Sequence, residues 1–514
     1  MAQPIFQNPR HLLLLAVLVC IALFINLGSI PLFDEDEGAY AEVTQEMLRS
    51  GDLITPRLEG KPFFHKPPIT YWTQVASVSV LGPSEFAFRL PSVIASIAWA
   101  ALLFLFVRRY INQRVAGFSV LFLATAVQTG LITRAAIPDA LLNLFITVTM
   151  FAIYAHSQKP RRAYILAAYI GMALGFLTKG PVAVLIPLAV SFLFFLWQKD
   201  LKSWWRGICH PLGWLLFLTI AMPWYLALYH RHGWQFLQEI FMVHNVGRFR
   251  SAMESHSGPF LYYVPVIVLG LMPFTTLLLK GVCAIRQQLA TPLGRFLWLW
   301  FGFVFVFFSL AGTKLHHYVV YGYVPLLIFM GQAVDRLKRP WLLALPAFLF
   351  LLFFFFFQDV ASWAWPRIDD VFAQLVVKGA LGEFGFAHRL VMAAALLTVI
   401  IVAFAPKWSI GLRTVLLSCL FVGLFSGYLI PKVARIIQLP VKKAALVAKS
   451  LGQDVVMWQV SYPSFSVYLG KPVSRRKPQV GDLVITKVSK LDTIKHNDIL
   501  FQEHGIVLTK IIGF

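Results

Sequence analysis

The chain has 514 residues, of which 58% are hydrophobic, and it carries a formal net charge of +22. Soluble domains contain roughly 45–50% apolar residues, so this composition excludes an ordinary soluble protein and predicts a polytopic membrane protein. The basic residues lie largely in short loops between apolar segments. This distribution indicates that the positive charge reflects the orientation of the chain in the membrane rather than nucleic-acid binding. The four cysteines show no CxxC spacing, which argues against a disulfide framework or a thiolate zinc site.

Apolar segments recur along most of the chain, and about 13 of them approach the length of a membrane span. The first is long enough to be a retained helix rather than a cleaved signal peptide. The predicted spans cover approximately residues 11–30, 86–107, 115–131, 140–156, 163–178, 181–197, 211–229, 260–279, 296–312, 318–334, 341–357, 388–405 and 412–430.

The loops between these segments predict the orientation of the chain. With the N-terminus inside, basic clusters fall on the same side in six alternate loops, from Arg108-Arg109 to Lys407 and Arg413. An excess of Lys and Arg marks cytoplasmic loops. The opposite side receives the loop 31–85, the C-terminal tail and nearly all the unusual polar residues, so we expect an active site at the outer membrane face.

The chain divides into two predicted domains, a membrane domain over residues 1–433 and a soluble α/β domain over 434–514. Within the first, the loop 31–85 contains an amphipathic juxtamembrane helix, Ala41–Leu48, that ends at Ser50-Gly51. In the second, we predict a helix over 442–451 and short strands over 455–458, 465–468 and 482–485. All of these predictions follow from periodicity and turn residues.

Four consecutive acids, Asp34 to Glu37, directly follow the first apolar segment. Charged side chains beside a membrane span are costly to desolvate, so such a cluster usually binds a ligand. Asp36 and Glu37 are candidates for a general base or for a carboxylate that orients an acceptor. The alternative is a surface acidic loop paired with nearby lysines.

Several cations and one further acid lie in the outer connections. Lys66 lies between Pro62 and Pro67-Pro68, which restrict the backbone, and it can neutralise a phosphate or simply meet lipid head groups. Arg134 and Asp139 flank Pro138, and an ion pair between them that caps a helix is the alternative to a catalytic role. Lys179 is a phosphate-binding candidate or a snorkelling lysine.

Histidines form a second group of candidates. His244, Asn245 and Arg248 share one outer loop, and Lys314, His316, His317 and Tyr318 begin a later span. A histidine cluster can bind zinc, but adjacent histidines do not share a helix face, so the metal signal is weak.

The order of these motifs resembles the aminoarabinose transferase family of GT-C glycosyltransferases, which are related to protein O-mannosyltransferases. The resemblance covers approximately residues 10–335. It rests on Asp36-Glu37-x-x-Tyr40-Ala41-Glu42, Lys66-Pro67, Asp139, Thr178-Lys179-Gly180, Pro223-Trp224, Arg248-Phe249, Pro259-Phe260-x-Tyr262-Tyr263-Val264-Pro265 and Lys314-Leu315-x-x-Tyr318.

The resemblance implies an inverting sugar transfer from undecaprenyl phosphate to lipid A or another envelope glycolipid, at the outer face of the bacterial inner membrane. It implies membrane lipids as partners, no nucleic acid, no obligatory cofactor and a tentative zinc ion. The site residues that it implies are Asp36, Glu37 and Asp139 as catalytic; Lys66, Lys179, Arg248 and Lys314 for the donor phosphate; Tyr40, Arg134, Tyr262 and Tyr318 for substrate; and His65 and His244 as tentative metal ligands.

Two competing functions stay open at this point. One is a protein O-glycosyltransferase. The other is a lipid or sugar transporter, which would place ionisable residues at mid-span, often in paired repeats; no such repeat is evident here. The sugar is also open, because Gly38-Ala39 stands where the aminoarabinose enzymes have Thr-Arg.

Overall fold

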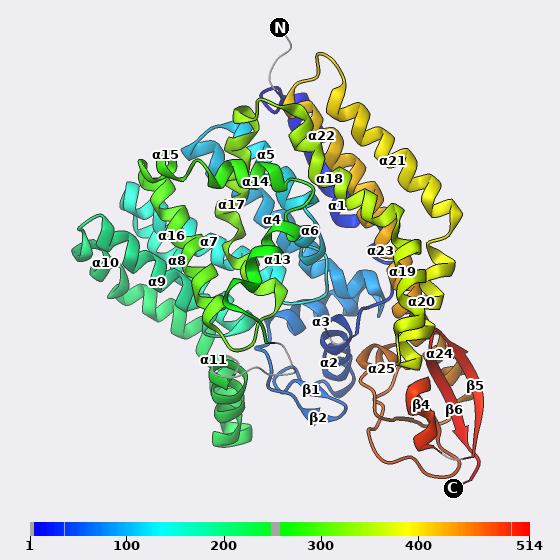
Figure 1. Cartoon of the computed structure of the whole chain (residues 1–514). Helices are drawn as coiled ribbons and strands as arrows, with labels where there is room; N and C mark the ends of the chain where they lie inside the picture. Colours follow the sequence, from blue (N-terminus) through cyan, green and yellow to red (C-terminus); the bar gives the residue numbers. More distant parts are fainter. Residues whose placement is uncertain (1–4, 35, 248–256, 495, 514) are drawn as a thin grey trace.

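The computed structural model describes residues 5–34, 36–247, 257–494 and 496–513, with the side chains of 244–246 left aside. A large helical domain occupies most of the molecule, and a small α/β unit lies at the end opposite the N-terminus (Figure 1). The helices of the first half are α1 (Pro9–Phe24), α2 (Glu37–Ser50), α3 (Ile69–Leu81), α4 (Glu85–Tyr110), α5 (Gln113–Thr125), α6 (Val127–Ile132), α7 (Asp139–Gln158), α8 (Arg162–Lys179), α9 (Val182–Trp197), α10 (Leu201–Ile208), α11 (Pro211–Leu237) and the π-helix η1 (Gln238–Gly247).

The second half of the helical domain continues in the same style, with several short or broken helices. Its elements are η2 (Phe260–Tyr262), α13 (Tyr263–Gly270), α14 (Thr275–Val282), α15 (Ile285–Leu289), α16 (Pro292–Leu310), η3 (His316–Gly322), α17 (Tyr323–Ala333), η4 (Val334–Arg336), α18 (Pro340–Phe355), α19 (Phe357–Ala364), η5 (Trp365–Arg367), α20 (Val371–Glu383), α21 (Phe386–Phe404), α22 (Ile410–Phe421), η6 (Val422–Leu429) and α23 (Ile430–Ile437).

The described residues contain seven helices long and apolar enough to cross a membrane, or eight if the bent pair α18 and α19–η5 forms one span. Three shorter apolar helices accompany them: Pro9–Phe24, Val182–Trp197 and Phe260–Gly270. The polytopic helical fold is therefore confirmed, whereas the count of about 13 spans stays a prediction. Two expected spans are broken: residues 115–131 divide into α5 and α6, and 260–279 divide into η2, α13 and α14.

The core of the helical domain is apolar and rich in aromatic rings. Trp99, Phe122 and Trp300 are fully buried in one continuous cluster, and the rings of Phe106 and Phe151 stack with their centroids 3.6 Å apart. Because lipid supplies no hydrophobic driving force between helices, such close side-chain packing is what holds a membrane bundle together.

The loop after α1 folds against the end of the bundle as two juxtamembrane helices and a small hairpin. Helix α2 contains the predicted segment 41–48 and ends at Gly51, whose φ of 69° is the left-handed value that favours glycine. Strands β1 (Arg57–Leu58) and β2 (Lys61–Pro62) pair antiparallel. Helix α3 then leads into α4.

The C-terminal unit consists of α24 (Leu439–Leu451), β3 (Val455–Met457), α25 (Pro463–Leu469), β4 (Leu483–Lys487), η7 (Val488–Thr493), β5 (Asn497–Glu503) and β6 (Ile506–Ile511). The strand order is β3-β4-β6-β5, with β3 parallel to β4 and the other pairs antiparallel. The predicted strand 465–468 is wrong, because Pro463 begins a helix there and Gly470, at a φ of 87°, ends it.

Polar contacts dock this unit on the juxtamembrane helices. Asp34 accepts hydrogen bonds from the backbone nitrogen and the hydroxyl of Ser464, both at 2.8 Å. The hydroxyl of Tyr468 accepts one from the nitrogen of Leu32 at 2.8 Å. Asp34 is therefore a docking residue between the two domains rather than free surface charge.

Candidate active site

Two cavities adjoin at the N-terminal end of α2. The larger, about 660 Å³, is lined by side chains from α2, the hairpin region, α7, α8, η3 and the C-terminal unit. The smaller, about 400 Å³, lies among the end of α1, the segment 131–137 and α23. Four residues line both cavities: Asp36, Ile137, His316 and His317. Volumes of this size are typical of small-molecule sites.

Asp36 occupies the junction between the two cavities. It is the residue before α2, and its side chain makes no capping hydrogen bond to that helix. Loss of hydration, and then the negative charge of Asp139, raise the pKa of Asp36 above its usual range, while Lys179 and His316 act in the opposite direction. A carboxylate with a raised pKa is a better proton acceptor than an ordinary aspartate.

Asp139 begins α7 and is only 2% exposed. Its two carboxylate oxygens accept hydrogen bonds from Nζ of Lys179 at 2.9 and 3.0 Å, and Oδ1 accepts one from Tyr321 at 2.6 Å. Lys179 also donates to the Tyr321 hydroxyl at 2.7 Å. The three side chains therefore form a closed triad, which holds the Lys179 ammonium group at the wall of the larger cavity.

Helix η3 explains why Tyr321 joins this triad. It is a 3-10 helix over His316–Gly322, and residues three apart eclipse one another in such a helix. Tyr318 and Tyr321 therefore share a face, and Lys179 Nζ lies 5.4 and 5.5 Å from the centroids of their two rings.

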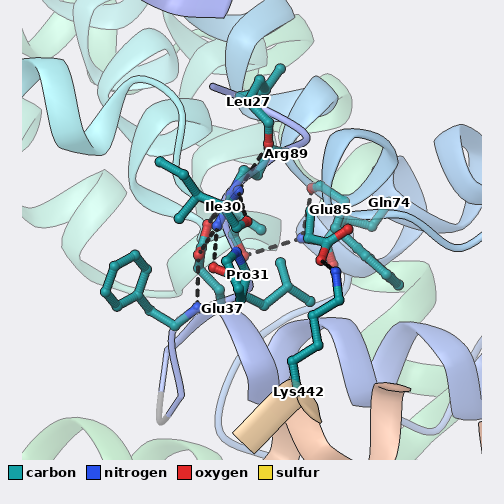
Figure 2. A network of polar contacts seen from close by, with 12 residues as sticks. Leu27, Ile30, Pro31, Glu37, Gln74, Glu85, Arg89 and Lys442 are labelled. Carbon is teal, nitrogen blue, oxygen red and sulfur yellow. Dashed lines mark hydrogen bonds and ion pairs between the residues drawn. The ribbon is translucent and has the colours of Figure 1, made fainter. Parts of the chain in front are cut away.

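Glu37 has a different environment from Asp36. It is buried, and Arg89 of α4 binds both of its carboxylate oxygens at 2.8 and 2.7 Å. The same guanidinium donates to the carbonyls of Leu27, Ile30 and Pro31, so the turn after α1 is tied to α4 (Figure 2). Although burial opposes it, the ion pair with Arg89 lowers the pKa of Glu37. This arrangement favours a supporting role for Glu37 over a catalytic one.

The structure brings several other predicted residues to the cavities. Lys66, His65, Tyr40 and Tyr318 line the larger one. Arg134 lines the smaller one and donates to the carbonyl of Ile25 at 3.1 Å and to Ser426 at 2.8 Å. Its partners thus lie directly after α1 and in η6, so the ion pair with Asp139 that the sequence suggested is not the contact it makes.

The remaining predicted residues fall into two groups. Lys314 is buried and donates to the carbonyl of Ala311 at 2.8 Å, and Tyr262 packs on Tyr263 with ring centroids 5.1 Å apart. Neither is among the residues that line the two cavities. Arg248 and the side chain of His244 lie outside the described residues.

The metal hypothesis finds limited support in the described residues. His65 stacks on Phe63 with ring centroids 4.0 Å apart. Among the side chains that the structure describes, no group of three or more His, Cys, Asp or Glu could hold a metal ion. The zinc ion stays an expectation that rests on the resemblance.

Sequence reasoning missed four residues at or around the site: Arg89, Tyr321, Ser461 and Arg475. The spacing Lys314-x-x-x-Tyr318-x-x-Tyr321 carried a signal for Tyr321, provided that the segment was recognised as a 3-10 helix. Ser461 and Arg475 line the larger cavity from the C-terminal unit, and a loop position in another domain leaves no local signal.

An α-helical membrane bundle with acidic and basic side chains gathered around cavities at one end, beside a small α/β unit, is the arrangement expected of a GT-C glycosyltransferase. Comparison supports this class. A family model described as dolichyl-phosphate-mannose-protein mannosyltransferase matches residues 65–226. A structure of ArnT from Cupriavidus metallidurans bound to undecaprenyl phosphate superimposes with a TM-score of 0.76 at 20% identity, over 98% of this chain and 99% of that one.

Sequence relatives then place the chain more narrowly. An uncharacterized protein of Aquifex aeolicus is 30% identical over 62% of this chain and 72% of its own length. The undecaprenyl phosphate-alpha-4-amino-4-deoxy-L-arabinose arabinosyl transferase of Shewanella sediminis is 31% identical over 60% of this chain, and the match spans 57% of the relative. The corresponding transferase of Serratia proteamaculans is 29% identical over 83% of this chain and 78% of its own length. The chain belongs to the ArnT-like family of GT-C glycosyltransferases.

Proposed function

We propose that the chain transfers one sugar from undecaprenyl phosphate to lipid A or another envelope glycolipid, at the periplasmic face of the bacterial inner membrane. The observation that carries this proposal is the pair of cavities that meet at Asp36. A transferase must bring two substrates to one point, and this junction offers that point beside a carboxylate. The names of the curated relatives make aminoarabinose the first sugar to test.

The larger cavity is assigned to the donor head group. Lys66 and Lys179 line it, and they would face the polyprenyl phosphate that departs as the glycosidic bond breaks. Fixed cations stabilise the negative charge that develops on such a leaving group. Asp139 and Tyr321 then act as positioning residues, because they hold the Lys179 ammonium through hydrogen bonds.

The smaller cavity is assigned to the acceptor. Its lining is largely apolar, and Arg134 supplies a cation there. An acceptor oxygen that enters from this side meets Asp36 at the junction. If that oxygen belongs to a hydroxyl group, Asp36 accepts its proton as the oxygen bonds to the anomeric carbon and the lipid phosphate leaves; if it belongs to a phosphate, Asp36 orients it.

The orientation and the domain division also belong to this proposal. The positive-inside pattern of the loops supports a cytoplasmic N-terminus. With that orientation, the predicted soluble domain over 434–514, which contains the C-terminal unit, would lie in the periplasm. The C-terminal unit and the two cavities lie at the same end of the molecule, because Ser461, Pro463 and Arg475 line the larger cavity.

The test is transfer by the purified protein in lipid nanodiscs, with undecaprenyl-phosphate aminoarabinose as donor and lipid A as acceptor, and with mass spectrometry of the products. Asp36→Asn should abolish transfer while the protein remains folded. Asp359→Asn is the matched control, because Asp359 forms an exposed ion pair with Arg389 in another part of the chain. Full activity of Asp36→Asn would remove the catalytic assignment.

A protein acceptor is the second candidate, since the matching family model is described as a protein mannosyltransferase. Mass spectrometry of lipid A and envelope proteins from a deletion strain separates the two. Loss of a lipid A modification supports the first candidate, and loss of protein glycosylation supports the second.

A further inference from the structure

The C-terminal unit forms part of the wall of the larger cavity. Ser461, Pro463 and Arg475 face the same space as Lys66 and Lys179. Ala39 of α2 lines the same cavity but offers only a methyl group to it. Arg475 thus brings a cation to the site from a domain that the membrane helices do not include.

The guanidinium group of Arg475 is held through a single nitrogen. Its Nη2 donates to Ser461 Oγ at 2.9 Å, and the same nitrogen forms an ion pair with Glu59 of the hairpin. Within the described residues, Nη1 and Nε donate to no protein acceptor, and the side chain is 38% exposed. The guanidinium is therefore fixed in place with donors left over.

The next residue, Arg476, is a structural arginine and serves as a comparison. Its Nη1 and Nη2 bind the two carboxylate oxygens of Asp482 at 2.6 and 2.8 Å, and it is not among the residues that line the cavity. The two adjacent arginines thus differ in two respects: Arg475 lines the cavity, and two of its nitrogens have no protein acceptor among the described residues.

We infer that Arg475 binds an anionic oxygen group, a phosphate or a carboxylate, on the head group of the donor or the acceptor. This inference rests on the proposed function. The donor phosphate, anchored by its lipid, is assigned to Lys66 and Lys179, whereas Arg475 belongs to a unit outside the helical bundle. The N–H groups of Nη1 and Nε can each donate a charge-assisted hydrogen bond to an oxygen of a carboxylate or phosphate.

The experiment measures initial rates of the full-length protein in nanodiscs against donor and acceptor concentration separately. Arg475→Gln should raise the KM for one substrate by about tenfold or more, with kcat nearly unchanged, since a hydrogen bond to a charged group is worth about 1.5–3 kcal/mol. Arg475→Lys should restore part of the loss. The substrate whose KM rises identifies the carrier of the anion.

Two further variants separate binding from a structural role. Arg476→Gln should leave both KM values unchanged. Glu59→Gln breaks the same link between the hairpin and the C-terminal unit but keeps the guanidinium, so it should not reproduce the effect of Arg475→Gln. Unchanged KM values for both substrates in Arg475→Gln, or equal defects in Glu59→Gln, would overturn the inference.

A binding measurement keeps the inference separate from the proposed function. If the unmodified protein transfers no sugar, the proposed function fails, and the site is then probed with inorganic phosphate. A phosphate-dependent rise in Tm that Arg475→Gln loses and Arg476→Gln retains supports the anion site, and equal rises in both variants overturn it.

Discussion

Lys179 donates hydrogen bonds to both carboxylate oxygens of Asp139, at 2.9 and 3.0 Å, across the gap between the end of α8 and the start of α7. Both side chains are nearly inaccessible to solvent, at 8% and 2% exposure. Removing one partner of a buried ion pair leaves an uncompensated charge, which costs about 3–5 kcal/mol. The pair should therefore behave as one unit.

Single and double substitutions test this unit. Asp139→Asn and Lys179→Gln should each lower kcat/KM by about 100-fold, since each disturbs a preorganised cation. The double variant should lose much less than the product of the two, because residues that act together are not additive. If the two losses in kcat/KM simply multiplied in the double variant, Asp139 and Lys179 would not act as one unit. Asp359→Asn, which breaks the exposed pair with Arg389, should change kcat/KM little.

Tyr321 should support transfer through its hydroxyl group alone. Tyr321→Phe removes the hydrogen bonds to Asp139 and Lys179 and should lower kcat/KM by about tenfold, with the ring retained in place. Tyr323→Phe is the matched control, because the hydroxyl of Tyr323, on the next helix, donates to Gln128 instead. Equal effects of the two variants on kcat/KM, at matched thermal stability, would show that Tyr321 contributes only to the fold.

The pH dependence of transfer should report the environment of Asp36. With a hydroxyl acceptor, the ionised form of Asp36 is the proton acceptor. Because the pKa of Asp36 is raised above 3.8, kcat/KM should then fall with decreasing pH, at a midpoint above 3.8. Asp139→Asn removes a negative neighbour and leaves Lys179 unneutralised, and both changes lower the pKa of Asp36. The acid limb of the residual activity should therefore move to lower pH. A shift to higher pH would contradict this assignment.

Glu42 should make the stability of the protein depend on pH. It is 1% exposed within α2, and burial, followed by repulsion from Glu59 and Glu46, raises its pKa from 4.5 to about 8. The folded protein retains a proton that the unfolded chain releases above pH 4.5, so the contribution of Glu42 to stability declines from pH 4.5 to about pH 8. Glu42→Gln should raise Tm at pH 8, by the equivalent of about 1–3 kcal/mol, and change it little near pH 4. A Tm difference that is the same at both pH values would contradict the assignment.

The sequence predicted the helical fold and the polar end of the molecule because both depend on local patterns. Apolar runs mark membrane helices. Asp139 and Lys179 stand at the ends of such runs, and Asp36 and Lys66 lie in the outer loop 31–85. The partners of Asp139 and Glu37 were harder to predict, because the contact with Tyr321 depends on a 3-10 helix and the contact of Arg89 with Glu37 brings α4 to the start of α2. Strand 465–468 failed because Phe, Val and Tyr favour strands, while Pro463 and Gly470 impose a short helix.

The close approach of the C-terminal unit to α2 was also not predicted from the sequence. It explains why position 38 is a glycine. A Cβ atom at this position would lie 2.7 Å from the nitrogen of Ser464 and 2.8 Å from Asp34 Oδ1. Both are parts of the hydrogen bond that docks the C-terminal unit. A side chain larger than hydrogen must therefore push the two domains apart at this contact.

Gly38→Ala should accordingly destabilise the docking by about 1–3 kcal/mol, lower Tm and increase cleavage by protease at the junction of α23 and α24, where Gln438 alone separates the two helices. Gly423→Ala is the matched control, since an added Cβ there meets no atom within 4 Å, and alanine favours a helix over glycine.

Asp34→Asn should weaken the same contact, because the charge-assisted hydrogen bonds to Ser464 are lost. Combining it with Gly38→Ala should cost less than the sum of the two, as both act on one contact. Resistance to protease equal to that of the unchanged protein in Gly38→Ala would show that the interface accommodates the methyl group.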